Sequence, residues 1–336
     1  MQSIKWIALG LLLALVGCGS PTTTTTSEST VDTANTPVPA ATEGSFTATD
    51  ATGTAITLTE PAERIVCTTE NCIDILAQLE VAPVAVLARN VGMAQDPRYL
   101  GDLAADITTI GGSWFEPNIE DIITAQPDLV IGYAGVQDAL RAPLADVAPV
   151  FLVAPLNYTD AIQDVANIGA LTGRTAAADA AIAAFRTQLD TYADQASGEV
   201  TPLVMYGSDV NFGISTSASL LGSALAEVTN YPWPRPDNVE DLGGDIPYSL
   251  EQVLAIDPDL IFVETLTFGD PAVPPLSEQM AESPLWRELK AVQAGQVYEV
   301  DADVWHSGGG LRSVSIALDE AMELMYPDLF DAESTE

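Results

Sequence analysis

The chain has 336 residues and a formal net charge of −37, from 48 acidic and 11 basic side chains. Such an acidic chain is unsuited to partners with dense negative charge, so we expect no binding to nucleic acid or to an anionic membrane surface. The chain has one histidine, which excludes a multi-histidine metal site, and it has no glycine-rich phosphate loop. No Ser-His-Asp set is suggested; Cys67 with His306 could make a nucleophile and a base, but we expect them in different lobes. We expect neither an enzyme nor a protein with a metal site or cofactor.

The N-terminus has the pattern of an export signal. Lys5 precedes an apolar stretch over 7–16, which is too short to span a membrane comfortably. The stretch ends in Leu-Val-Gly-Cys, the form of a bacterial lipobox, so we predict a signal peptide over 1–17 and a lipidated Cys18; a plain signal peptide with an incidental cysteine is the alternative. Residues 18–45, rich in Thr, Ser and Pro, are predicted to be a disordered tether between the lipid anchor and the folded part. The protein is thus expected to be exported and held at the cell membrane through lipid alone.

Residues 46–157 predict a first α/β lobe. A hairpin over 46–58 comes first, with a turn around Gly53. Short apolar runs without alternation follow, which suit strands buried on both faces of a parallel sheet. The expected order is strand 64–67, helix 72–79, strand 83–88, helix 119–125, strand 129–133, helix 137–146 and strand 150–153.

The two cysteines of this lobe, Cys67 and Cys72, lie at the corner between its first strand and a helix that we expect Asn71 to cap. An even pair in an exported protein favours a disulfide. Free thiols and a redox or metal role are the alternatives, because disulfide geometry is demanding.

Residues 158–198 predict linking helices, at 159–171 and 175–195. The second is rich in alanine, carries Ile182, Phe185 and Leu189 along one side, and would run about 30 Å at 1.5 Å per residue. Residues 199–328 predict a second α/β lobe, and 329–336 an acidic tail. The lobe is expected to contain a strand from Pro202, helices at 219–228 and 250–256, strand 260–263, helix 284–291, strand 296–300 and helix 311–325.

One phrase occurs twice in the chain. Asn118-Ile-Glu-Asp-Ile-Ile leads to Pro127-Asp-Leu-Val-Ile, and Ser249-Leu-Glu-Gln-Val-Leu leads to Pro258-Asp-Leu-Ile-Phe; each copy follows a paired glycine. Asn118 and Ser249 are good helix N-caps, and each proline ends the helix that they begin. A repeat over this distance indicates a duplicated domain rather than a solenoid.

These copies belong to a wider set of motifs. The others are Pro61-x-x-Arg64-Ile-Val, Ser283-Pro-Leu-Trp286 with its continuation to Tyr298, and Trp305-x-x-Gly-Gly-Gly. Together they resemble the substrate-binding lipoproteins of ABC importers for ferric siderophores, haem and cobalamin, over roughly residues 46–328. The resemblance implies an α/β fold with two Rossmann-like lobes joined by a single long rigid helix, and a ligand cleft between the lobes. It also implies a monomer whose partner is an ABC permease dimer with its ATPase.

The resemblance assigns a role to the repeated glutamates Glu120 and Glu251, which would dock onto arginines of the permease. Their position supports this, because a helix that follows a strand starts at the sheet edge that lines the crevice. The alternative is that each carboxylate only stabilises the start of its helix through the helix dipole.

Ligand contacts are expected from loops after strands, where binding residues concentrate. The candidates are Thr68, Arg89, Trp114, Phe115 and Tyr133 in the first lobe, and Tyr206, Asp209, Trp233, Arg235, Trp305 and His306 in the second. The arginines would bind an anionic ferric chelate, or as surface residues would pair with the plentiful carboxylates. The Gly308–Gly310 stretch could offer backbone N–H groups to an anion. Each aromatic residue could instead pack under its own loop. We expect an iron(III)-siderophore as ligand, with cobalamin second and haem third, where His306 could be an axial ligand; an enzyme or adhesion protein is a remote alternative.

Overall fold

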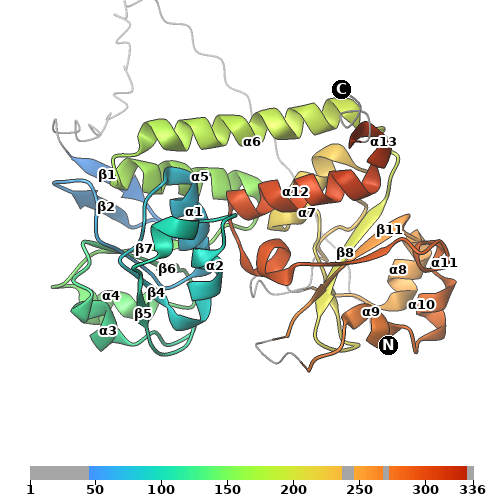
Figure 1. Cartoon of the computed structure of the whole chain (residues 1–336), viewed down its shortest axis with the longest axis horizontal. Helices are drawn as coiled ribbons and strands as arrows, with labels where there is room; N and C mark the ends of the chain where they lie inside the picture. Colours follow the sequence, from blue (N-terminus) through green and yellow to red (C-terminus); the bar gives the residue numbers. More distant parts are fainter. Residues whose placement is uncertain (1–44, 237–245, 268–271, 331–336) are drawn as a thin grey trace, which may run out of the picture. The chain divides into compact units, whose positions relative to one another are not determined.

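The structure, a computed structural model, describes residues 45–236, 246–267 and 272–330. They belong to one compact unit, Thr42–Glu336. Within the described residues, the strands form one two-stranded hairpin and two five-stranded sheets (Figure 1). The predicted signal peptide, Cys18, nearly all of the predicted tether and the end of the acidic tail lie outside these residues.

The first sheet is parallel throughout, in the strand order β5-β4-β3-β6-β7. The hairpin β1 (Phe46–Thr49) and β2 (Ala55–Leu58) precedes it, as predicted. The strands of the sheet are β3 (Ile65–Cys67), β4 (Ala85–Leu87), β5 (Thr108–Ile110), β6 (Leu129–Tyr133) and β7 (Val150–Val153). Strand β5 was not predicted, because it is a short edge strand whose two threonines are exposed and give no apolar run.

The second sheet has the order β10-β9-β8-β11-β12. Its parallel strands are β8 (Pro202–Gly207), β11 (Leu260–Thr265) and β12 (Val297–Val300), and the remaining two are β9 (Gly213–Ile214) and β10 (Ile246–Pro247). Strand β9 is antiparallel to both β8 and β10, so β10 runs in the same direction as β8. Two-residue strands leave no periodic pattern, and the sequence did not predict them.

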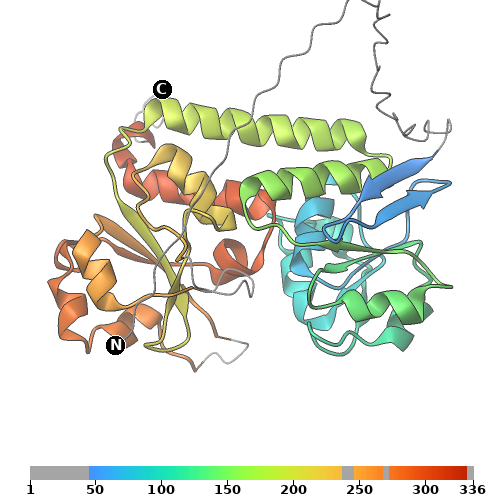
Figure 2. The same ribbon diagram turned by 180° about the vertical axis from the view of Figure 1, so that it is seen from behind.

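The helices of the first half flank its sheet and continue into the link (Figure 1). They are α1 (Glu70–Leu79), α2 (Val91–Gln95), α3 (Ile119–Thr124), α4 (Arg141–Leu144), α5 (Tyr158–Leu171) and α6 (Thr175–Gln195), with 3-10 turns η1 (Ala88–Asn90), η2 (Gly101–Ala104) and η3 (Asp138–Leu140). Helix α6 has the predicted bounds and buries Ile182, Phe185 and Leu189. It contacts α1 and α5 of the first half and α7 and α12 of the second, and Figure 2 shows it from behind, running along both.

The second half carries α7 (Leu220–Val228), α8 (Leu250–Ile256), α9 (Leu276–Met280), α10 (Pro284–Glu288), α11 (Lys290–Gln293), α12 (Leu311–Met325) and α13 (Pro327–Phe330). The predicted helix 284–291 is two helices, because Leu289 has an extended backbone. A π-helical turn, η4 (Asp303–Ser307), connects β12 to α12 and was not predicted.

The repeated helix starts are built as the sequence predicted. The Asn118 side chain accepts hydrogen bonds from the backbone N–H groups of Glu120 and Asp121, and Ser249 forms a capping box with Gln252. Asn71, in contrast, does not cap α1, which begins after Thr69.

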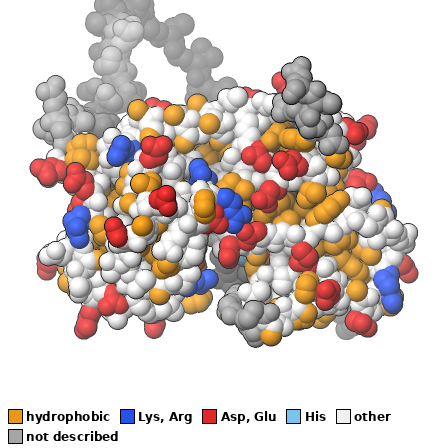
Figure 3. Space-filling model, in the orientation of Figure 1, with side chains coloured by type: hydrophobic (Ala, Val, Ile, Leu, Met, Phe, Trp, Pro, Cys, Tyr) orange, Lys and Arg blue, Asp and Glu red, His pale blue; other side chains and the backbone are white. Residues whose placement is uncertain are grey.

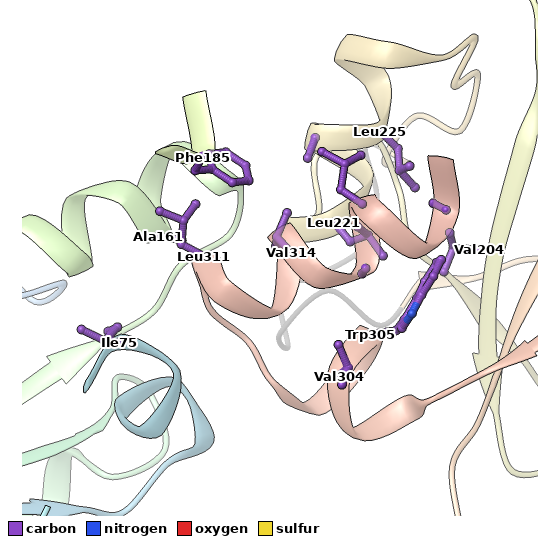
Figure 4. Packing of buried hydrophobic residues seen from close by; sticks show 14 of the residues in the cluster. Ile75, Ala161, Phe185, Val204, Leu221, Leu225, Val304, Trp305, Leu311 and Val314 are labelled. Carbon is purple, nitrogen blue, oxygen red and sulfur yellow. The ribbon is translucent and has the colours of Figure 1, made fainter. Parts of the chain in front are cut away.

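Buried apolar side chains of both halves form one continuous cluster. Among the residues of this cluster that Figure 4 draws, Ile75 and Ala161 of the first half lie on the same side as Leu311, and Trp305 lies beside Val204. On the face that Figure 3 shows, acidic side chains are scattered among hydrophobic and uncharged ones and are more common than basic side chains. A shared core of this kind opposes independent movement of the two halves.

Candidate functional site

The parallel strands of each sheet point their carboxyl ends at the loops that carry the predicted ligand residues. In open α/β sheets, ligands bind outside these ends. The edge of the first sheet leads into Thr68, Arg89, Trp114 and the end of β6 at Tyr133, and that of the second into the turn after β12. The candidate site is therefore described one edge at a time.

At the first edge, a disulfide joins Cys67 to Cys72, with their Cα atoms 5.4 Å apart, which confirms that pairing. Thr68 inside this corner is fully buried and donates to Gln137 Oε1 at 2.7 Å. The prediction that Thr68 contacts ligand is therefore wrong for this conformation, because the side chain is buried and its hydroxyl already has hydrogen-bond partners.

Three aromatic residues gather beside that corner. The rings of Trp114 and Phe115 meet edge to face at 5.1 Å, and Trp114 lies 5.7 Å from Tyr133. The Phe115 side chain is 69% exposed, whereas Trp114 and Tyr133 are half-buried. Gln137 holds the Trp114 backbone through a 2.6 Å hydrogen bond to its carbonyl. The structure thus brings these predicted residues together as a partly accessible aromatic surface.

Arg89 stands at the carboxyl end of β4 with more than half of its side chain exposed, and its Nε lies 3.5 Å from Glu70 Oε1. Burial raises the pKa of the Glu70 carboxyl, while its own backbone N–H and the Arg89 charge pull it down. Arg89 is available to an anionic ligand, in competition with this carboxylate.

At the second edge, two predicted aromatic contacts are wrong. Trp233 has no exposed surface and donates its Nε1 proton to the Pro202 carbonyl at 2.6 Å. Trp305 is 5% exposed, donates to Glu320 at 2.6 Å and packs against Phe262. Each of these buried indole N–H groups has a hydrogen-bond partner, so both side chains are accommodated in the core.

The other predicted residues of this edge differ in their exposure. Asp209 is exposed and accepts a hydrogen bond from the Asn211 backbone, and Arg235 is half-buried. Tyr206 is 6% exposed, and its ring centroid lies 4.7 Å from that of His306. The structure places Tyr206 under His306, so His306 is the more accessible of the pair.

A carboxylate from the loops that we expected to line the cleft, but did not single out as a ligand contact, completes this group. Glu264, near the end of β11, is fully buried, and its Oε2 lies 3.0 Å from Nδ1 of the half-buried His306. In the sheet register Glu264 lies between Tyr206 of β8 and Val300 of β12. A glutamate ending an otherwise apolar strand was the sequence signal that could have singled it out.

The start of α12 joins the two halves. Asp74 of α1 accepts hydrogen bonds from the backbone N–H groups of Arg312 and Ser313, at 2.9 and 2.8 Å, and from Ser313 Oγ at 2.6 Å. Burial raises the pKa of Asp74, and these bonds oppose the rise. A Cβ atom at Gly310 would come within 2.2 Å of Asp74 Oδ1, so the glycines permit this close approach. The N–H groups of Arg312 and Ser313, which follow the Gly308–Gly310 stretch, are thus taken by a carboxylate of the chain, and the role of the stretch itself in binding an anion stays a prediction.

Other polar contacts cross the same junction. Arg98 bridges Asp96 and Asp301 at 2.8 and 2.7 Å, and Tyr99 shares a 2.7 Å hydrogen bond with Ser313. The residues after β12 are therefore tied to the first half as well as to their own sheet.

The repeated glutamates lie at equivalent places in the two halves. Glu120 and Glu251 are exposed in the first turns of α3 and α8, each of which leads into the fourth strand of its sheet. Hydrogen bonds from its own backbone N–H and from Ser249 lower the pKa of Glu251. Both carboxylates are accessible to a partner.

A hollow of about 550 Å³ lies elsewhere, lined by Arg64, Val84 and Thr108 at the opposite, amino edge of the first sheet. It is open to solvent and distant in the fold from the candidate edges. Among the residues that the structure describes, no group of three or more His, Cys, Asp or Glu side chains is placed to hold a metal ion.

The sequence model of the periplasmic binding protein family matches residues 65–304. This chain belongs to that family. It is a family of binding proteins rather than enzymes, and the described fold, with two α/β lobes, agrees with it. In the described part of the chain, none of the helices is both long and apolar enough to cross a membrane.

Relatives and solved structures agree. The chain is 26% identical over 255 residues to the Fe(3+) dicitrate-binding periplasmic protein FecB of Escherichia coli, covering 74% of this chain and 80% of the relative. It is 25% identical to the Fe(3+)-citrate-binding protein YfmC of Bacillus subtilis, covering 80% and 83%. A cobalamin-binding protein of Halobacterium salinarum is 26% identical, covering 76% and 67%. The triscatecholate siderophore binding protein FeuA of Bacillus subtilis has the same fold, with a TM-score of 0.65 at 21% identity over 83% of this chain and 98% of FeuA.

Proposed function

We propose that this protein captures an iron(III) chelate, a siderophore or ferric citrate, and delivers it to the permease of a bacterial ABC importer. The observation that carries the proposal is the similarity to ferric-citrate-binding relatives over four fifths of their length. The exposed Phe115 and Arg89 at the first edge and His306 at the second give such a ligand rings and positive charge to contact. Cobalamin is the second candidate, because a cobalamin-binding protein is also among the relatives.

The proposal extends to the setting of the protein. Glu120 and Glu251 would dock onto arginines of a permease dimer with its ATPase, one glutamate from each half of a monomeric binding protein. The chain would be exported and tethered through lipid on Cys18, in keeping with relatives named as periplasmic proteins and lipoproteins. Lipid on one cysteine holds a protein at a membrane without a spanning helix.

Fluorescence of the protein without its signal peptide tests the ligand. We expect ferric citrate or one of a panel of ferric hydroxamates and catecholates to quench the tryptophan emission and to show a micromolar or tighter Kd by calorimetry. Trp114 is the expected reporter, because it is half-buried beside the exposed Phe115. Trp114→Phe should remove most of the quenching, whereas Trp286→Phe, which changes a buried indole in α10, should keep it.

The same panel includes cobalamin and haemin. Tight binding of cobalamin without binding of any iron chelate would transfer the assignment to the second candidate. Haemin binding with an intense Soret band would assign haem instead. Absence of binding across the panel would contradict the proposed function.

A further inference from the structure

The carboxyl edge of the second sheet holds a buried carboxylate in contact with the chain's only histidine. Glu264 has no exposed surface, and its Oε1 has no hydrogen-bond partner among the residues that the structure describes. A buried carboxylate with one oxygen unsatisfied is costly unless a nearby positive charge compensates it. His306, whose Nδ1 lies 3.0 Å from Glu264 Oε2, can supply such a charge when its ring is protonated.

The surrounding residues fix the plane of the His306 ring. Its centroid lies 4.7 Å from that of Tyr206, with the planes inclined at 48°. Tyr206 is itself seated against Gly213, where an added Cβ atom would come within 2.4 Å of the phenol ring. Burial raises the pKa of Tyr231, and the nearby charge of Glu264 raises it further. The Tyr231 hydroxyl donates to the Ser215 carbonyl at 2.8 Å. The imidazole is thus held on one face by a ring and at Nδ1 by a carboxylate.

We propose that Glu264 is a positioning residue for ligand recognition, which holds His306 as a charged imidazolium whose Nε2–H donates to an anionic oxygen of the ligand. Since Nδ1 is taken by Glu264, a ligand contact of the ring falls to Nε2. The inference deepens the proposed function and rests on it for the identity of the ligand. An imidazolium at this place would favour iron(III) chelates that carry carboxylate oxygens over neutral ferric hydroxamates. It could not coordinate iron directly, because an imidazolium has no lone pair to donate.

Nitrogen-15 NMR tests the pair without any ligand, because a tag-free protein gives the imidazole signals of a single histidine. At pH 7 we expect both ring nitrogens of His306 to be protonated. Glu264→Gln keeps an acceptor for Nδ1 but removes the charge, and should give a neutral ring. Glu299→Gln is the matched control, since it removes an exposed carboxylate from the neighbouring strand β12 and should leave the ring charged. A neutral ring in the wild-type protein would overturn the proposal.

Binding measurements test the consequence. We expect Glu264→Gln and His306→Gln each to weaken the affinity for ferric citrate at least about tenfold, with Glu299→Gln and the affinity for a neutral ferric hydroxamate unchanged. His306→Gln alters a half-buried side chain, so it serves if Glu264→Gln does not fold. With gallium(III) citrate as a diamagnetic probe, the Nε2 proton should remain and shift; its loss on binding would show metal coordination and contradict the inference.

The possible failures are distinguishable. If the wild-type protein binds no iron chelate, the proposed function fails, while the ring protonation still reports on Glu264. If it binds ferric citrate and neither variant weakens that binding, only the role of Glu264 and His306 is refuted.

Discussion

The two halves of this protein share one framework but differ in chemistry at the same place in it. Tyr133 and Glu264 both lie thirteen residues after a repeated glutamate (133 − 120 and 264 − 251). In the first half this position contributes an aromatic ring beside Trp114, and in the second a buried carboxylate beside His306. The helix and the strand that follows it are equivalent in the two halves, whereas the residue at the sheet edge differs. A ligand held between the edges would meet rings on one side and a charged pair on the other.

The largest effect that we expect concerns what the halves have in common. The double change Glu120→Arg and Glu251→Arg should reduce iron uptake to background, because both docking carboxylates would repel the arginines of the permease. Ligand affinity should stay within about twofold of wild type, since the side chains proposed to contact the ligand, Arg89, Phe115 and His306, are unchanged. Uptake of radioactive iron by cells that lack their own binding protein, together with calorimetry, measures both.

The matched control for this pair is Glu63→Arg with Glu288→Arg. It makes the same charge change at one exposed glutamate in each half, outside α3 and α8. It should leave uptake near wild type. Equal loss of uptake in the two double variants would mean that overall charge, and not these two positions, governs docking.

A second prediction concerns the contact that joins the halves. Asp74→Ala should lower the free energy of unfolding by about 3–5 kcal/mol, because it leaves buried donors at the start of α12 without an acceptor. Hydrogen exchange should accelerate in both α1 and the first turn of α12. Chemical denaturation and exchange mass spectrometry check this.

Asn157→Ala is the comparison for Asp74→Ala. Asn157 caps α5 within one half through a capping box, so its loss should cost about 1 kcal/mol and affect exchange in α5 alone. If Asp74→Ala is no more harmful than this local cap, the contact of Asp74 with α12 contributes little to joining the halves.

The sequence predicts features that neighbouring residues determine, but not contacts between segments that are distant in the chain. The caps Asn118 and Ser249 and the long helix α6 could be predicted, because a few neighbouring residues determine them. The burial of Trp233 could not, because a tryptophan before a proline is typical of a loop and its partner carbonyl belongs to Pro202. Nor could the role of Asp74, whose partners in α12 are more than 200 residues away along the chain.

The same limit applies within the candidate site. The ends of the predicted strands indicated which loops could contact a ligand. In those loops Arg89 and Phe115 are exposed and His306 is half-buried. The spacing did not distinguish Thr68, which points its hydroxyl into the interior, from these residues. Local pattern predicts where a loop begins, whereas the packing of side chains from other strands decides which of its residues a ligand can reach.

The smallest effect that we expect concerns Asp164, which differs from Asp74, the other buried carboxylate at the junction of the halves. Asp74 has several donors, whereas Oδ2 of Asp164 in α5 has no hydrogen-bond partner within the described part of the chain. Burial, and then the charges of Asp160 and Asp50, raise the pKa of Asp164 to about 7. Because the folded state holds this proton more tightly than the unfolded state, the stability that it contributes is present in full below the unfolded pKa near 4 and is lost as the pH rises through about 7.

Asp164→Asn mimics the protonated carboxyl at every pH. The variant should therefore match wild type near pH 4 and exceed it by about 1–3 kcal/mol at pH 8, a gain in Tm of several degrees. Thermal unfolding at a series of pH values measures the difference. An equal gain at both ends of the pH range would show that the benefit comes from the amide itself and not from removal of a buried charge.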